Sequence, residues 1–163
     1  MCLSVSGSQN GHTMENDTAA TILVVDDEDD ILLLCRVNLE FEGYRVATAS
    51  SGVEGLELAR EIRPSMILLD VMMPSMDGWH VLEALKSDPE TSSIPVVMLT
   101  ARVQGEDQMR GWSGGAADYI MKPFSPVALL ETLRNVLHPA DPEEAERRRA
   151  RSLEKLRLLN TQF

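Results

Sequence analysis

Met66-Ile67-Leu68-Leu69 is an apolar run that ends in Asp70 and continues into the turn Val71-Met72-Met73-Pro74-Ser75-Met76-Asp77-Gly78. A short apolar run bounded by Pro and Gly is typical of a strand that is buried on both faces, as in a parallel sheet. A carboxylate at the last residue of such a strand lies where open α/β sheets bind their ligands. Residues 66–78 therefore indicate an α/β fold, and they make Asp70 the first candidate functional residue.

Three further apolar runs also lead directly into candidate site residues. Residues 22–25 lead to Asp26 and Asp27, residues 95–99 lead to Thr100 and Ala101, and residues 119–121 lead to Lys122. If the four runs are parallel strands of one sheet, three carboxylates, one hydroxyl and one ammonium meet in a single crevice. This set of groups suits the transfer of a phosphoryl group with the help of a divalent cation such as Mg²⁺.

Amphipathic helical patterns separate the apolar runs. The predicted strands cover residues 21–26, 44–48, 66–70, 95–100 and 117–121. The predicted helices cover residues 29–42, 52–62, 77–87 and 104–112, and a fifth follows Pro123 with Ser125 as N-cap and Pro126 at its first position. Five strands alternating with five helices imply a doubly wound parallel sheet, because right-handed crossovers place helices on both faces. The helical positions expected to face the core are Ile31, Leu34, Cys35, Leu39 and Phe41 in the first helix, and Val53, Leu56, Leu58 and Ala59 in the second.

The length of 163 residues accommodates one domain and two tails. Residues 1–20 are polar and are predicted to be a disordered leader, and residues 21–138 form the predicted domain. Residues 139–163 form a charged helical tail with a narrow stripe of Leu153, Leu156 and Leu159. Interleaved acids and bases favour a solvated helix with i, i+4 ion pairs. The alternatives for this tail are a nucleic-acid contact, a homodimer seam and docking on a partner.

The formal net charge is −11, with 26 acidic and 15 basic residues. Such a balance argues against nonspecific attraction to DNA or to an anionic membrane, so we expect no direct nucleic-acid binding and no membrane insertion. The two cysteines, Cys2 and Cys35, do not suggest a disulfide framework. With no signal-peptide pattern and no apolar run long enough to span a membrane, the expected location is cytoplasmic.

Four motifs together resemble the receiver domain of bacterial two-component response regulators. They are the acidic pair in Val24-Val25-Asp26-Asp27-Glu28, the phosphoacceptor segment Leu68 to Gly78, the switch hydroxyl in Leu99-Thr100-Ala101, and the lysine motif Ala117-Asp118-Tyr119-Ile120-Met121-Lys122-Pro123-Phe124. Each motif alone is weak, but their order and spacing over residues 21 to 138 are specific. The resemblance implies a flavodoxin-like sheet with strand order 2-1-3-4-5.

The resemblance also implies a role for each site residue. Asp70 would accept a phosphoryl group from a histidine kinase or a histidine phosphotransfer protein, with Mg²⁺ held by Asp27, Asp70 and the Met72 carbonyl, and by Asp26 through water. Lys122, the Thr100 hydroxyl and the Ala101 backbone N–H would contact phosphoryl oxygens. Thr100 and Tyr119 would act as a switch that repacks the surface of the fourth helix, fifth strand and fifth helix for a downstream protein target.

Several alternatives remain open on the sequence. The chain is interpreted as a signalling switch or phosphorelay intermediate that catalyses only its own phosphorylation and dephosphorylation. It could instead be the receiver part of a longer transcription regulator, a binding module with a vestigial pocket, or a phosphatase of the haloacid dehalogenase type. The phosphatase is disfavoured because Met72 stands where those enzymes carry a second Asp. We also hypothesise that Met72 and Arg102 set the lifetime of the phosphoryl group.

Overall fold

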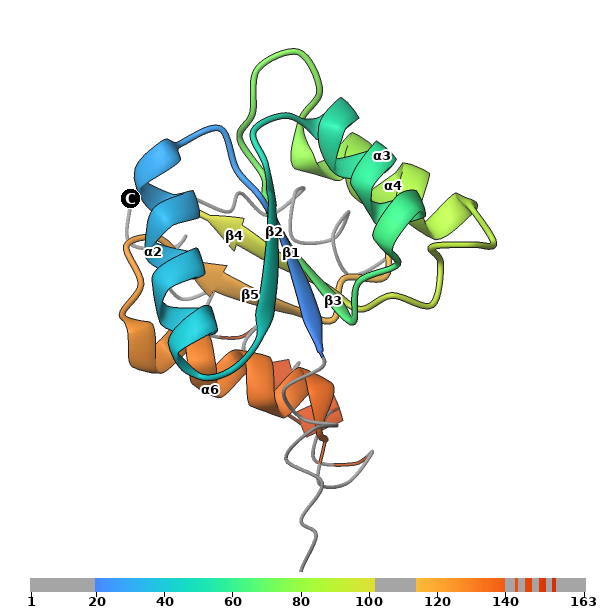
Figure 1. Ribbon diagram of the computed structural model, residues 1–163. Helices are drawn as coiled ribbons and strands as arrows, with labels where there is room; N and C mark the ends of the chain where they lie inside the picture. The colour runs from blue at the N-terminus through green and yellow to red at the C-terminus, as the bar shows by residue number, and fades with distance from the viewer. Residues whose placement is uncertain are drawn as a thin grey trace, which may run out of the picture.

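The computed structural model describes residues 20–101 and 114–139, with six positions of the tail: Glu143, Glu146, Arg147, Ala150, Arg151 and Glu154. The elements are β1 (Thr21–Val25), α2 (Asp29–Phe41), β2 (Arg45–Ala49), α3 (Gly52–Ile62), β3 (Met66–Asp70), α4 (Gly78–Ser87), β4 (Val96–Thr100), β5 (Asp118–Met121) and α6 (Pro126–Leu137) (Figure 1). The predicted strands agree with these bounds to within one residue at each end. The predicted helix at 104–112 and the leader up to residue 19 lie outside the described residues.

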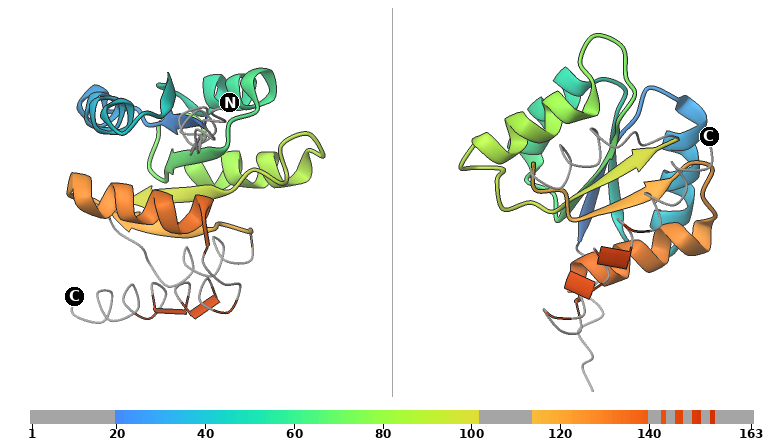
Figure 2. Two further views of the ribbon diagram at one scale, coloured as in Figure 1. Left: turned by 60° about the horizontal axis from the view of Figure 1, so that its bottom comes forward. Right: turned by 180° about the vertical axis from the view of Figure 1, so that it is seen from behind.

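The five strands form one parallel sheet with the order β2-β1-β3-β4-β5, which confirms the predicted topology. Helices α2 and α6 cover one face, and α3 and α4 cover the other (Figures 1 and 2). Because side chains alternate along a strand, Leu23 and Val25 pack with the α3 and α4 side, while Ile22 and Val24 pack with α2 and α6. All four of these side chains are buried, as expected for a sheet covered on both faces.

Helix starts follow the capping residues in the sequence. The Ser125 side chain accepts a hydrogen bond from the Ala128 N–H, and Pro126 occupies the first turn of α6, as predicted. Ser51 caps α3 and Asp77 caps α4 in the same way. The strand-to-helix connections that end at these caps place polar residues at the carboxyl edge of the sheet.

Two predicted core positions are wrong. Phe41 is 89% exposed, because α2 packs through Cys35 and Leu39, and a residue two positions beyond Leu39 lies on the opposite side of a helix. Val53 is 54% exposed, because the buried residues of α3 are Gly52, Gly55 and Ala59, and Val53 does not lie on that face. A side-chain carbon on Gly55 would lie 2.9 Å from a Val25 methyl, so the helix approaches β1 through its smallest residues.

The described tail positions and the lengths of the helices bear on two further predictions. The six described tail positions are helical and exposed, and Arg147 pairs with Glu143 at 3.2 Å, the i, i+4 contact that the charge pattern predicts. Among the residues the structure describes, no helix combines the length and apolar character that a bilayer crossing needs.

Candidate functional site

The carboxyl ends of four neighbouring strands place the predicted site residues along one edge of the sheet. Asp26 and Asp27 directly follow β1, Asp70 ends β3, Thr100 ends β4, and Lys122 directly follows β5. The strand register aligns these ends, because Val25 is opposite Leu69, Asp70 is opposite Leu99, and Thr100 is opposite Met121. The sheet therefore gathers groups that are up to 96 residues apart in the sequence, Asp26 and Lys122 being the extremes.

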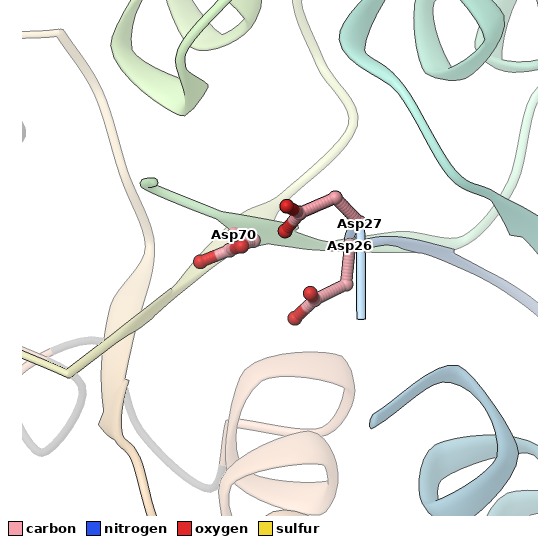
Figure 3. A group of neighbouring side chains, drawn as sticks. All are labelled: Asp26, Asp27 and Asp70. Atoms are coloured by element: carbon pink, nitrogen blue, oxygen red, sulfur yellow. The ribbon is translucent and has the colours of Figure 1, made fainter. Parts of the chain in front are cut away.

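Three carboxyl groups form the centre of the site. One oxygen from each of Asp26, Asp27 and Asp70 lies within 4.8 Å of the others. In Figure 3 the side chains of Asp26 and Asp27 leave the end of β1 and extend toward Asp70. Asp26 and Asp70 are buried while Asp27 is exposed, so the cluster has one side open to solvent. Such a set of hard oxygen donors could hold a divalent cation.

Lys122 supplies the positive charge of the site. Its Nζ lies 2.7 Å from Asp26 Oδ2, 3.3 Å from Asp70 Oδ1 and 3.4 Å from Glu28 Oε1. Its backbone N–H donates to the Thr100 carbonyl at 2.8 Å, which ties the residue to the end of β4. Burial acts to lower the pKa of Lys122, but the hydrogen bond to Asp26 and the charges of Asp70, Asp26 and Glu28 outweigh it and leave this pKa raised. The lysine therefore stays charged at neutral pH.

The environment of Asp70 disfavours its charged form. Its pKa is raised from an ordinary 3.8 to about 7, mainly by burial and next by the negative charge of Asp26. The Lys122 charge and a 3.3 Å hydrogen bond from the Met72 N–H act in the opposite direction but do not cancel these effects. One ammonium does not balance three neighbouring carboxylates, so a further cation would reduce the electrostatic repulsion among them.

The connection after β3 holds Asp70 in place from the backbone. The Gly78 N–H donates to the Val71 carbonyl at 2.8 Å, which brings the start of α4 against the end of β3. A side-chain carbon on Gly78 would overlap the Asp70 carbonyl oxygen and would lie 2.8 Å from the Val71 Cα. Only glycine fits this contact, so the Asp-Gly turn that the sequence shows has a packing reason.

The two predicted switch residues lie close to the site on neighbouring strands. Thr100 is fully buried at the end of β4, and Ala101 is exposed directly after it. Tyr119 is buried on β5, and its ring packs against Trp79 with the centroids 6.4 Å apart and the planes tilted by 54°. Trp79 follows Gly78 at the start of α4, so the aromatic pair connects the Asp70 turn with β5.

Sequence reasoning missed two of these contacts. Glu28 pairs with Lys122, although the only signal was a third acid after Asp26 and Asp27. Trp79 packs on Tyr119, although its position next to Gly78 suggested no more than a helix start. Met72 is 71% exposed, and its backbone N–H donates to Asp70 Oδ1 at 3.3 Å.

The comparison with known protein families agrees with the geometry. Residues 22–134 match the response regulator receiver domain, which is more than half of the chain. The chain belongs to the response regulator receiver domain family. Its parallel sheet has the strand order that the resemblance implied.

The match with similar solved structures extends over nearly the whole of those chains. The Vibrio cholerae chemotaxis protein CheY4 is 36% identical with a TM-score of 0.70, over 72% of this chain and 98% of that one. A CheY-like receiver domain protein from Methanospirillum hungatei is 35% identical with a TM-score of 0.69, over 79% of this chain and 98% of that one. Both are similar in fold and in sequence to the receiver described above.

Similar curated proteins are longer than the match. The DNA-binding dual master transcriptional regulator RpaA of Synechocystis is 42% identical over 120 residues, which are 74% of this chain and 50% of the relative. The DNA-binding response regulator MtrA of Mycobacterium tuberculosis is 42% identical over 125 residues, 77% of this chain and 54% of the relative. The chain therefore spans about half the length of these relatives.

These relatives overturn one expectation from the sequence. We expected no direct nucleic-acid binding because the chain is strongly acidic, yet receivers 42% identical to this one occur in proteins named as DNA-binding. The physical reason is that net charge describes the long-range field of the segment in hand. It does not exclude DNA binding by a protein that contains such a receiver.

Proposed function

We propose that the protein is a phosphorylation-activated switch of a two-component system or phosphorelay, in which Asp70 accepts a phosphoryl group from a histidine kinase or a histidine phosphotransfer protein. The observation that carries the proposal is the position of Asp70. Its carboxyl group is buried at the end of β3, within reach of two further carboxylates and within 3.3 Å of the Lys122 ammonium. A carboxylate attacks an anionic donor only where nearby positive charge offsets the repulsion.

The donor set fits Mg²⁺. Two carboxylates about 5 Å apart repel by roughly 3 kcal/mol at an effective dielectric constant of about 20, and Lys122 offsets only part of this repulsion. Asp27 and Asp70 are the side-chain ligands in this proposal, with the Met72 carbonyl beside them and Asp26 acting through water. When bound, the cation would neutralise charge on the carboxylates and on the phosphoryl oxygens.

The chain's own residues position the phosphoryl group. Lys122 would contact a phosphoryl oxygen, which its long side chain allows without breaking its 2.7 Å contact with Asp26. The Thr100 hydroxyl at the end of β4 and the Ala101 backbone N–H directly after it would donate to another oxygen. Such a site acts through positioning and electrostatic stabilisation, so it needs no general acid or base.

The output of the switch would run through the aromatic pair. A movement of Thr100 toward the phosphoryl group would change the space available to Tyr119, which packs on Trp79. This would repack the surface formed by residues 104–112, β5 and α6 for a downstream protein target, with residues 104–112 outside the described part of the chain. Two alternative packings of one element are what a switch requires.

A second candidate function is transcription control by a longer protein of which this chain is the receiver part. It is favoured by RpaA and MtrA, which are named as DNA-binding and are about twice as long as the match. Reading the gene beyond the codon for Phe163 tests it: an open frame that encodes a further domain supports it, and a stop codon there contradicts it.

A phosphatase of the haloacid dehalogenase type remains disfavoured. The position two residues after Asp70 carries Met72, whose exposed thioether cannot donate or accept a proton as an acid or base catalyst. The proposed activity is therefore limited to phosphorylation and dephosphorylation of Asp70 itself.

The central test is phosphate incorporation from a small donor. We expect the protein incubated with phosphoramidate and Mg²⁺ to gain one phosphoryl group by intact mass spectrometry, and Asp70→Asn to gain none, because asparagine keeps the shape but not the nucleophilic oxygen. Chelation of Mg²⁺ should suppress the gain in the wild type. Phosphate incorporation that persists in Asp70→Asn would show that another residue is the acceptor.

The side chain of Met72 should affect how long the phosphoryl group lasts. It is 71% exposed two residues beyond Asp70, where a water molecule would approach the phosphorus. An amide can orient that water by hydrogen bonding and a thioether can do so only weakly, so Met72→Asn should shorten the phosphoryl lifetime several-fold. Phe41→Asn likewise replaces an exposed apolar side chain with an amide, here on α2, and should leave the lifetime unchanged. Equal decay rates in both variants and the wild type would refute the hypothesis. Arg102, the other residue that the hypothesis names, lies outside the described residues.

A further inference from the structure

Glu28 has an unusual position for a residue at the start of a helix. It is the N-cap of α2, where Ser, Thr, Asp or Asn would accept a hydrogen bond from the first turn, and its side chain makes no capping hydrogen bond. Its Oε1 instead lies 3.4 Å from the Nζ of Lys122, a residue 94 positions away. The side chain thus contacts the charged centre of the site rather than its own helix.

The three carboxylate partners of Lys122 differ in how easily they can be released. An ammonium group has three N–H donors, and Lys122 has three carboxylates within 3.4 Å. The side chains of Asp26 and Asp70 are 0% and 3% exposed, whereas that of Glu28 is 61% exposed. An exposed ion pair contributes little and water replaces it at low cost, while separation of a buried pair leaves an unpaired charge.

We propose that Glu28 is a positioning residue that occupies one N–H of Lys122 in the unphosphorylated protein and yields it to a phosphoryl oxygen. This inference rests on the proposed function, because it assigns the change of partner that Lys122 undergoes when Asp70 is phosphorylated. Asp26 keeps its short contact and anchors the lysine. Glu28 leaves because it is the partner that solvent can best accommodate.

The consequence is that Glu28 restrains anion binding at the site. A phosphoryl group or a mimic must displace the Glu28 carboxylate from Lys122, and the negative charge of Glu28 also opposes its approach. Glu28→Gln keeps the size of the side chain and removes the charge. It should not weaken the start of α2, because the Glu28 side chain makes no capping hydrogen bond there. Removal of a restraint of this kind should strengthen anion binding rather than weaken it.

The test measures the binding of beryllofluoride to the whole chain in the presence of Mg²⁺, followed by the fluorescence of Trp79 and Trp112. Glu28→Gln should bind beryllofluoride about two- to fivefold more tightly than the wild type, the range expected for loss of one exposed ion pair. Phosphorylation by phosphoramidate should accelerate by a similar factor. Asp29→Asn makes the same charge change on the next residue, which is exposed and is not among the described partners of Lys122.

A second measurement reports the contact without any phosphoryl group. In the metal-free protein the nitrogen NMR resonance of the Lys122 ammonium should shift in Glu28→Gln and stay in place in Asp29→Asn. Unchanged beryllofluoride affinity in Glu28→Gln, or an equal gain in Asp29→Asn, would overturn the inference about Glu28. If the wild type is phosphorylated in the same experiments, the proposed function still holds. A wild type that takes up neither phosphoryl group nor beryllofluoride would overturn both.

Discussion

Replacement of Asp70 by asparagine is expected to stabilise the metal-free protein at neutral pH. Folding raises the pKa of this carboxyl group from 3.8 to about 7, so between these values the folded protein holds a proton that the unfolded chain has released. The stability of the wild type should therefore fall as pH rises through this window. At about 1.4 kcal/mol per pKa unit, the full difference is on the order of 4 kcal/mol above pH 7.

The measurement is chemical denaturation of both proteins between pH 4 and pH 8 in the presence of a chelator. Asp70→Asn should lack the fall with pH and should be the more stable protein at pH 8. Mg²⁺ should raise the stability of the wild type and leave the variant nearly unchanged, because the cation relieves the same repulsion. A wild type whose stability does not decrease over this range would contradict the argument.

Asp88→Asn is a matched control, because its expected effect on folding stability is opposite to that of Asp70→Asn. The pKa of Asp88 is lowered, first by the hydrogen bond from the Glu90 N–H and then by the Arg60 guanidinium 2.9 Å away. This carboxylate therefore stabilises the fold above its unfolded pKa and loses that contribution as pH falls. Its replacement should slightly destabilise the protein at neutral pH, whereas replacement of Asp70 stabilises it. The Asp70 carboxylate is thus an example of a charge that destabilises the fold but serves an active site, a common trade-off.

Gly78→Ala is expected to destabilise the protein strongly, although alanine is the better helix former. At an ordinary helical position this change would add about 1 kcal/mol of stability. Here the added carbon would overlap the Asp70 carbonyl oxygen and crowd the Val71 Cα, and backbone atoms cannot rotate away as a side chain can. We expect a loss of about 3 kcal/mol or more and a displaced Asp70.

Thermal and chemical denaturation measure the loss, and Gly55→Ala provides the comparison. The carbon added at Gly55 would meet a Val25 methyl at 2.9 Å, a side-chain contact that can partly adjust. Gly78→Ala should therefore be the more damaging of the two, and its folded fraction should also accept less phosphate. Equal stabilities of the two variants would show that the close backbone approach at Gly78 has no energetic weight.

Local patterns were sufficient for most of the secondary structure. The run 66–70 and the helix 52–62 have the predicted bounds, because a buried strand needs continuous apolar residues and Ser51 and Pro64 mark the helix ends. The prediction of the core was less complete. Phe41 and Val53 are apolar yet exposed, since the side of a helix that meets the sheet depends on which residues permit close approach.

By itself, the sequence determined which groups stand at the four strand ends, since the alternation of apolar runs and turn residues dictates where each strand ends. In the parallel sheet the side chains of Asp26, Asp27, Asp70 and Lys122 lie together. Only the tertiary structure decided that Glu28 is a partner of Lys122 and that Trp79 packs on Tyr119. Those contacts join segments with no shared local pattern, and their geometry is set by how α2 and α4 pack against the sheet that contains β5.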